Sequence, residues 1–272
     1  MLKIRILLVL LWFCGLTHTT FARSHLDSLH TILKKTTNDK EQIALKLAIC
    51  AVHKSSYNGD SLVYYSENIL ESSNITRYEA GVANRYLGTG YYFLGDYMKA
   101  MLMYERSIAI FNEINDQREL QVSLNNLGIM YEIFGKLDSA LLTYKKAIII
   151  AEALQDHDGL GDLYNNIAIV HNLKGQKTAA FSSYRKSLKY EKLSGDSIGV
   201  ADTYANLGAI YYALSMSDKT IDYMIRAGNI YSYLGDTIKL AMIYANLATN
   251  YIALKQYNLA EENFLKAAQI QD

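Results

Sequence analysis

Four asparagines recur at a spacing of forty residues, and their type and placement come closest to a binding function. They are Asn126, Asn166, Asn206 and Asn246. A side-chain amide donates and accepts hydrogen bonds at once, so it can pair with the C=O and N–H groups of any peptide backbone. Such a row suits the capture of an extended chain, although each amide could instead bond only a neighbouring helix or water.

Catalytic and metal-binding patterns are missing from the sequence. The six histidines have no spacing typical of metal ligands. Gly88-Thr89-Gly90 lies in a helical pattern with no preceding strand, so it does not match a phosphate-binding loop. Neither a nucleophile elbow nor a metalloprotease motif occurs. We therefore predict that the protein is not an enzyme and that it uses no metal and no cofactor.

Composition narrows the range of partners. The 27 Lys and Arg residues are balanced by 27 Asp and Glu residues, so the chain lacks the strong positive field that nucleic-acid binding usually needs. Its 2 cysteines cannot form a disulfide framework. Cys50 lies in an apolar helical stretch, where we expect a buried and unreactive thiol. We expect a protein or peptide partner and no nucleic acid.

The elements that must position the asparagines form a repeat of forty residues. Small residues recur at two positions of each copy, and an aromatic residue or methionine follows the second. The first position holds Gly88, Gly128, Ala168, Gly208 and Ala248, the second Ala100, Ala140, Ala180, Thr220 and Ala260, and the third Tyr104, Tyr144, Tyr184, Met224 and Phe264. A period of this length predicts an array of repeated units.

Each unit has the pattern of two helices. In one copy the helical period runs from Val122 to Phe134, breaks at Gly135 and resumes from Leu137 to Leu154. The turn position holds Gly95, Gly135 and Gly175, then Ser215 and Lys255. We therefore expect close helix pairs, with small residues at the contacts and aromatic rings beside them.

Aspartates mark the start of each following helix. Asp116, Asp156, Asp196 and Asp236 recur at the same forty-residue spacing. An aspartate there can accept hydrogen bonds from the free N–H groups of the next helix. Asp116 with Glu119, and Thr76 with Glu79, also match the capping-box pattern. Helix starts are therefore expected just after these residues.

These units resemble tetratricopeptide repeats. One copy meets the family pattern with Gly128, Tyr131, Gly135, Ala140, Tyr144 and Ala147. The resemblance implies an all-α fold, a right-handed superhelical solenoid of antiparallel helix pairs. Two departures are visible: the period is forty residues rather than about 34, as in kinesin-light-chain-like variants and many bacterial sensor proteins, and the segment 214–220 lacks the turn glycine and the small alanine.

The resemblance divides the chain into three parts. Residues 1–22 are predicted to be a signal peptide, and residues 23–75 to be an N-terminal helix (His25 to Lys35) followed by a degenerate repeat from Asn38 to Ser72. Residues 76–272 are predicted to form five units, at about 76–115, 116–155, 156–195, 196–235 and 236–272.

The resemblance also implies a concave groove lined by the first helix of each unit. The position two residues before the first small residue points into that groove and holds Tyr86 and the four asparagines. The same register adds Arg85, Tyr92, Asn125, Glu132, Asp162, Asn165, Asn172, Asp202 and Tyr212. Only Arg85 could grip a C-terminal carboxylate, so a basic or neutral extended segment with a few apolar anchors fits better.

Two functions remain open. The first is a non-catalytic scaffold that binds an extended peptide or protein segment in this groove. The second is a sensory or regulatory repeat region of an envelope signalling protein of the exported bacterial type that lacks its output module. Leu265, Ala268 and Ile270 have no following helix to pack against, so the C-terminal helix could also associate with another protein or with itself.

The first residues predict export. Lys3 and Arg5 precede an apolar run from Ile6 to Phe13, and small residues before Arg23 suit cleavage after Ala22. We expect a periplasmic or secreted protein. The alternative is an uncleaved leader that anchors the chain to the membrane, and membrane contact is expected only in that case. Modification of Cys14 by lipid is a third alternative, although the bulky Trp12 and Phe13 fit such a processing site poorly.

Overall fold

The computed structural model describes residues 18–271, and within this range all the regular structure is helical. The chain divides into two compact units, residues 1–110 and 111–272, and each is described by itself. The first unit holds α2 (His18–Lys35), α3 (Asp39–Ser55), α4 (Gly59–Leu70), α5 (Arg77–Phe93) and most of α6 (Tyr97–Glu113). The predicted all-α fold is confirmed.

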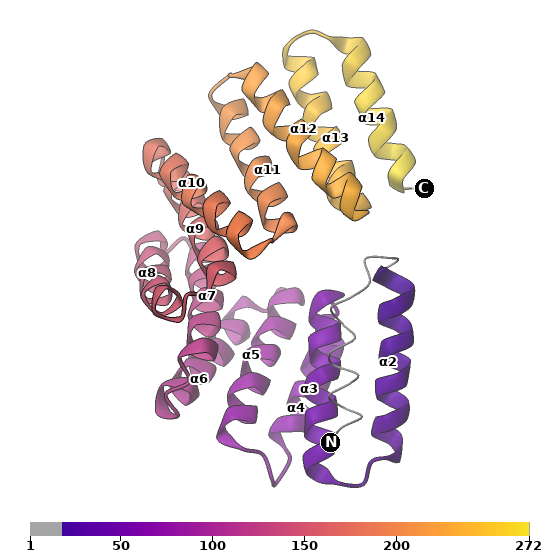
Figure 1. Cartoon of the computed structure of the whole chain (residues 1–272), viewed down its shortest axis with the longest axis vertical. Coiled ribbons are helices and arrows are strands. Elements are labelled where there is room, and N and C mark those ends of the chain that lie inside the picture. The colour runs from indigo at the N-terminus through magenta and orange to yellow at the C-terminus, as the bar shows by residue number, and fades with distance from the viewer. Residues whose placement is uncertain (1–17, 272) are drawn as a thin grey trace. The chain divides into compact units, whose positions relative to one another are not determined.

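The second unit is a row of helical hairpins (Figure 1). Its helices are α7 (Gln117–Ile133), α8 (Leu137–Leu154), α9 (His157–Leu173), α10 (Lys177–Ser194), α11 (Ser197–Ala213), α12 (Ser217–Leu234), α13 (Thr237–Ala253) and α14 (Tyr257–Gln271). Each odd-numbered helix packs along the next even-numbered one, and α8, α10 and α12 also pack against the first helix of the following pair. Neighbouring hairpins therefore supply each other's core, as in a solenoid.

Small residues allow the paired helices to approach closely. A Cβ atom built on Gly128 would lie 2.3 Å from Cε1 of Tyr144, and one on Gly88 would lie 2.7 Å from Cε1 of Tyr104. Both rings are buried and cover the helix backbone where no side chain projects. Phe264 occupies the same position of the repeat but is 45% exposed, because α14 packs mainly against α13.

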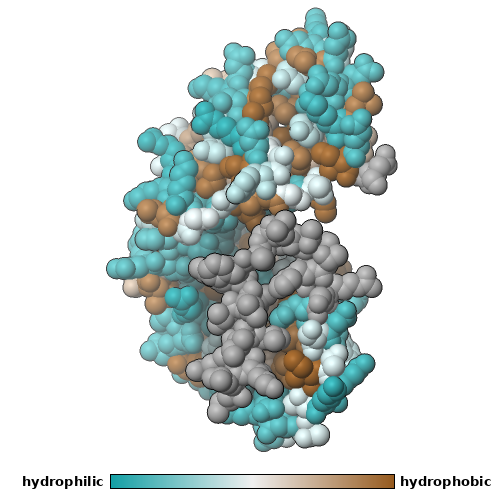
Figure 2. Space-filling model, turned by 45° about the vertical axis from the view of Figure 1, so that its right-hand side comes forward, coloured by the Kyte–Doolittle hydropathy of each residue, from teal (hydrophilic) through white to brown (hydrophobic). Residues whose placement is uncertain are grey.

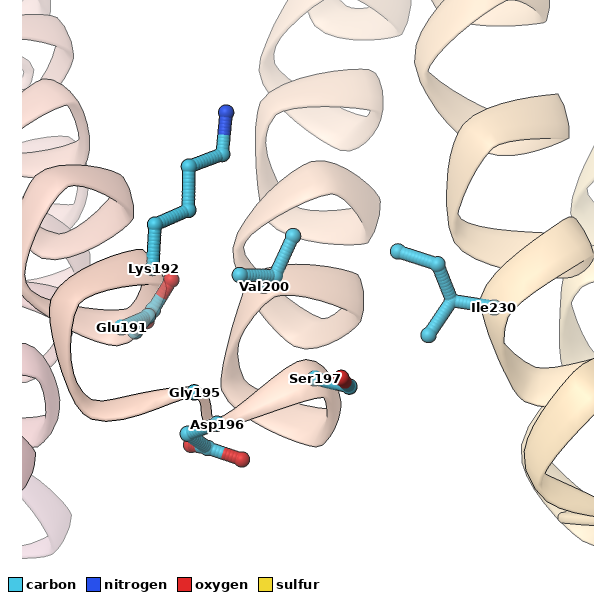
Figure 3. A pocket seen from close by; sticks show the side chains of 7 residues that line it. All are labelled: Glu191, Lys192, Gly195, Asp196, Ser197, Val200 and Ile230. Carbon is cyan, nitrogen blue, oxygen red and sulfur yellow. The ribbon is translucent and has the colours of Figure 1, made fainter.

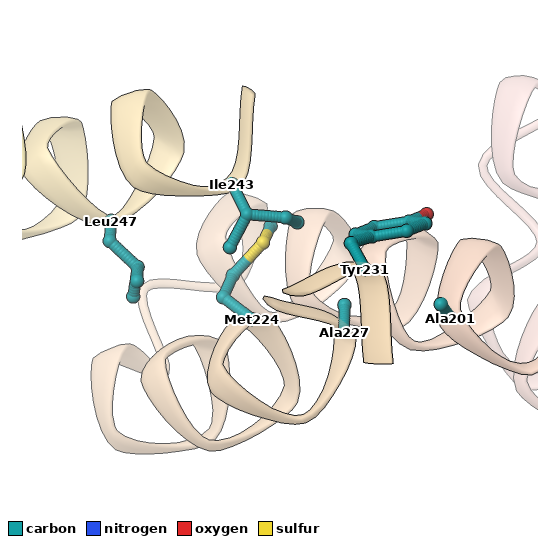
Figure 4. Packing of buried hydrophobic residues seen from close by; sticks show 6 residues of the cluster. All are labelled: Ala201, Met224, Ala227, Tyr231, Ile243 and Leu247. Carbon is teal, nitrogen blue, oxygen red and sulfur yellow. The ribbon is translucent and has the colours of Figure 1, made fainter. Parts of the chain in front are cut away.

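The pair α11–α12 forms a regular hairpin although it lacks the turn glycine and the small alanine of the other units. Met224, Ala227 and Tyr231 of α12 pack with Ala201 of α11 and with α13 in one buried cluster (Figure 4). Thr220, where the other units have alanine, is buried, and its hydroxyl donates to the C=O of Met216 at 3.2 Å. The local hydrogen bond satisfies the polar atom, so threonine is tolerated there.

A residue with a left-handed backbone conformation (positive φ) follows each helix from α5 to α13, and these residues are twenty positions apart. The predicted turn glycines Gly95, Gly135 and Gly175 all have positive φ, and so do their replacements Ser215 and Lys255. The sequence pattern did not reveal that the turns between units are built in the same way, at Asn115, Gln155, Gly195 and Gly235. A residue in this conformation lets the chain reverse after a helix and satisfies its last carbonyl groups.

Three of the four recurring aspartates cap helices as predicted. Asp116, Asp156 and Asp236 each accept a hydrogen bond from the backbone N–H three residues later, and Thr76 forms the full capping box with Glu79. The prediction is wrong for Asp196, which sits at the N-cap without a side-chain hydrogen bond.

The N-terminal part starts with α2, which begins before the helix predicted from His25 to Lys35 and ends at the same residue. Helices α3 and α4 occupy the segment predicted to hold the degenerate repeat, and Ile43, Cys50, Leu62 and Ile69 pack there with α5. Residues 1–17, which carry most of the predicted leader, lie outside the described range. Within that range no helix combines the length and apolar character needed to cross a membrane.

Candidate peptide-binding wall

Two pairs of asparagines join the first helices of consecutive hairpins. Asn166 of α9 donates from Nδ2 to Oδ1 of Asn125 of α7 at 2.9 Å. Asn206 of α11 donates in the same way to Asn165 of α9 at 3.1 Å. These two hydrogen-bonded pairs, here called the amide rungs, show that the predicted groove asparagines of three successive repeats lie side by side on α7, α9 and α11. The face formed by the first helices of the second unit, α7, α9, α11 and α13, is here called the wall.

The rungs leave hydrogen-bonding capacity on the wall. All four paired side chains are half-buried, as is Asn126 beside them. A side-chain amide has two N–H donors and an oxygen with two lone pairs, and each rung uses one donor of one amide and one lone pair of the other. The rungs link the amides of neighbouring repeats, and each paired amide keeps donors or acceptors that the rungs do not use.

The series of amide rungs does not continue to α13. Asn246 is exposed, and the residue forty-one positions earlier, where a rung partner would stand, is Ala205. The sequence aligned the four asparagines and left open that each amide bonds a neighbouring helix, as Asn166 and Asn206 do, but it did not identify their partners Asn125 and Asn165. The sequence feature that could have revealed these partners is an asparagine forty-one residues before each donor, Asn125 before Asn166 and Asn165 before Asn206.

The acidic residues expected on the wall have different environments. Asp162 is exposed. Asp202 accepts from Lys239 Nζ at 2.8 and 2.9 Å and from the Tyr231 hydroxyl at 2.5 Å, so it is part of a link between α11, α12 and α13. Glu132 is half-buried and accepts from the Tyr144 hydroxyl at 3.5 Å, and burial raises the pKa of its carboxyl.

Farther along the unit the wall becomes apolar. Tyr212 of α11 is 43% exposed, and on α13 the exposed fractions are 61% for Met242 and 46% for Ile252. Met242 stands in the register position that Asp162 and Asp202 hold in the two preceding repeats. Figure 2 shows apolar patches within the hydrophilic surface over the C-terminal helices. Asn172, another expected wall residue, accepts from Lys177 Nζ.

Three predicted groove residues lie in the first unit. Arg85 is only 8% exposed, with its guanidinium carbon 5.1 Å from the ring centre of Tyr86. It therefore differs from the exposed groove cation that was expected, because the helix turns it into the packed interior. Tyr92 is half-buried, with its ring 5.9 Å from that of Tyr97.

A small cleft lies at the turn between α10 and α11. It has a volume of about 230 Å³ and is lined by residues that include Glu191, Lys192, Asp196 and Ile230 (Figure 3). The cleft is open to solvent and four of its seven lining residues are polar or charged, so it lacks the enclosed and mostly apolar lining of a small-molecule site.

Glu191 beside this cleft is a buried acid that sequence reasoning missed. It is 3% exposed, and its Oε1 accepts from Ser187 at 2.5 Å and from Thr203 at 2.7 Å. Burial raises the pKa of the carboxyl, and the nearby Asp196 and Asp202 raise it further. The sequence feature that could have revealed Glu191 is an acidic residue at a repeat position that is apolar in other copies, such as Ala151.

The side chains that could bind a metal ion are dispersed over the described part of the chain. No three His, Cys, Asp or Glu side chains gather there in a way that could hold a metal ion. Cys50 is buried as predicted, and burial raises the pKa of its thiol to about 11. A thiol with such a pKa is a poor nucleophile at neutral pH.

Comparison with protein-family models identifies tetratricopeptide repeats. One such model matches residues 78–153 and again 119–192, and a second matches residues 241–272, so that together they cover more than half of the chain. A comparison of the sequence with curated proteins gave no significant match.

Several solved structures share the fold. BtubC (BKLC) from P. vanneervenii is 21% identical, with a TM-score of 0.64 over 87% of this chain and 92% of its own. Aspartyl phosphate phosphatase F from Bacillus subtilis is 15% identical, with a TM-score of 0.69 over 92% of this chain and 68% of its own. A Rap protein complexed with Competence and Sporulation Factor is 11% identical, with a TM-score of 0.71 over 91% of this chain and 69% of its own. These identities speak for the fold only, but the family-model matches and the hairpin repeats lead to one conclusion: the chain belongs to the tetratricopeptide repeat family.

Proposed function

We propose that this protein is a non-catalytic scaffold whose second unit binds an extended segment of a partner protein along α7, α9, α11 and α13. The observation that carries the proposal is the pair of amide rungs, Asn125–Asn166 and Asn165–Asn206. They hold side-chain amides of successive repeats in a row, and each amide keeps a donor or an acceptor for the backbone of a bound segment.

The chemistry of the wall indicates what such a segment would carry. The part formed by α7 and α9 has amides and the acidic Glu132 and Asp162, so it favours an uncharged or basic stretch. The part formed by α11 and α13 exposes Tyr212, Met242 and Ile252, which suit an apolar anchor. The partner segment would thus pair its backbone with the amides and place an apolar side chain toward α13.

The Rap protein complexed with Competence and Sporulation Factor gives this proposal a precedent in fold alone. A tetratricopeptide repeat array commonly acts as a scaffold that presents one face to other proteins. The proposal for this chain rests on its own side chains along the wall.

The test uses a peptide selected from a random library for binding to the full protein. The double variant Asn126→Ala/Asn246→Ala removes two wall amides that are outside the rungs, so we expect about tenfold weaker binding and an unchanged melting temperature, at roughly 0.5–1.5 kcal/mol for each hydrogen bond. Fluorescence anisotropy measures the affinity, and circular dichroism measures the melting.

The matched control replaces two exposed asparagines on second helices, Asn229→Ala/Asn258→Ala. This variant should bind the peptide like the parent protein. If both double variants bind equally well, or if the wall variant loses affinity only together with its folded structure, the wall is not the binding site.

A further inference from the structure

The outer face of α10 carries a row of positive charge. Arg185, Lys186, Lys189 and Lys192, here called the basic stripe, are all exposed. Their spacing places them on one face of the helix over roughly 10 Å of its length. The helix has one acidic residue, Glu191, and it is 3% exposed and turned into the core. The basic stripe therefore presents four cations, and α10 has no exposed carboxylate beside them.

The register position of Lys186 is neutralised in two other repeats, whereas Arg106 of α6 and Lys146 of α8, at the same position, have leucine four residues before them. Arg226 of α12 forms an ion pair with Asp222 at 3.0 Å, and Lys266 of α14 forms one with Glu262 at 2.7 Å. In α10 the equivalent cation is Lys186, and the residue four positions before it is Ser182. In the described part of the chain, the four residues of the basic stripe make no ion pair.

Aromatic rings hold two of the amines in position. Lys186 Nζ lies 4.7 Å from the ring centre of Tyr164, and Lys189 Nζ lies 5.1 Å from that of Tyr190. The two rings are stacked, 5.7 Å apart and 5° from parallel. A cation above an aromatic face is stabilised and loses less freedom when it binds an anion. The stripe is therefore partly preorganised.

We propose that the basic stripe is a second docking surface, which binds an acidic segment of a partner protein. The charges are complementary, and carboxylates three to four residues apart on a helix would meet successive cations of the stripe. This surface lies on a second helix, whereas the proposed peptide wall is formed by first helices, so the two proposals stand independently.

Nucleic acid and membranes fit the stripe less well. The faces of Tyr164 and Tyr190 are covered by each other and by the lysine amines, so they offer no platform for a base. A helix that enters a membrane surface needs a broad apolar face. On α10 the exposed large apolar side chain is Leu193, next to the last stripe residue. An acidic protein segment remains as the partner class.

The experiment measures binding of a fluorescent poly-glutamate peptide to the full protein as salt is raised. Lys186→Gln/Lys189→Gln removes two stripe charges and should weaken binding about fivefold at low salt, in line with the energies of exposed charge pairs. The matched variant Arg226→Gln/Lys266→Gln removes two charges that already have partners, and its affinity should change less than about twofold.

Equal weakening by both variants would mean that overall charge, rather than the stripe, attracts the peptide, and the proposal would be overturned. Stronger binding of a single-stranded oligonucleotide or of phosphatidylserine vesicles than of poly-glutamate, lost in the Lys186→Gln/Lys189→Gln variant, would assign the stripe to another partner class and also overturn it. Circular dichroism confirms that all variants are folded.

Discussion

Replacement of Glu191 by glutamine should change how the stability of this protein depends on pH. The carboxyl is buried, two hydroxyl groups donate to its Oε1, and its Oε2 has no hydrogen-bond partner. The charged groups that face it are Asp196 and Asp202, and Lys239 already pairs with Asp202. Burial therefore raises the pKa of Glu191 above its ordinary value of 4.5.

The sign follows from proton linkage. The folded state holds the Glu191 proton more tightly than the unfolded state, so the free energy of unfolding falls as pH rises from about 4.5 to the folded-state pKa. Within this window one extra proton gives a slope of up to about 1.4 kcal/mol per pH unit. Glu191→Gln cannot titrate, and its stability should lack this decline.

The assay is urea unfolding followed by circular dichroism from about pH 4 to about pH 8. The difference in unfolding free energy between Glu191→Gln and the parent should grow in favour of the variant as pH rises, and then level off. Glu152→Gln, which removes an exposed carboxylate from α8, is the control for net charge. Parallel curves for the parent and Glu191→Gln over the whole range would refute the reasoning.

The remaining predictions concern packing and thiol reactivity. Gly128→Ala should lower the unfolding free energy by about 2–3 kcal/mol, because its Cβ would lie 2.3 Å from the Tyr144 ring. Gly135→Ala should lower it by about 1 kcal/mol through the positive φ alone, since a Cβ there meets no atom within 4 Å. If urea unfolding gave the same loss of free energy for both variants, the steric cost assigned to Gly128 would be contradicted. In a Cys14→Ser background, Cys50 should react with a thiol reagent at pH 8 only after unfolding, because burial raises its pKa to about 11; rapid labelling of the folded protein would count against that.

Much of the fold could be predicted because it is set by local patterns. The helix from Leu137 to Leu154 has the bounds that its hydrophobic period indicates. Asp116 and Thr76 cap helices where their positions in the repeat predict. These features depend on residues a few positions apart, and forty-residue repetition tests each prediction several times within one chain.

The candidate wall was predictable only in part. The forty-residue spacing placed Asn126, Asn166 and Asn206 on equivalent helices, but it did not show that Asn166 and Asn206 bond to Asn125 and Asn165. Whether an amide faces solvent or a neighbour depends on the side chain that the next repeat supplies. At Asn246 that neighbour position is Ala205, and the rung is absent.

The amino-acid sequence by itself determined the number of residues per unit, the helical hairpins and the small residues at their contacts, because helix periodicity, capping and turn chemistry act over short stretches of chain. Only the tertiary structure decided that Arg85 is buried, that Glu191 lies among hydroxyl groups and that Asp202 pairs with Lys239. Burial and charge pairing depend on groups brought together from separate helices, and packing decides which of those groups meet.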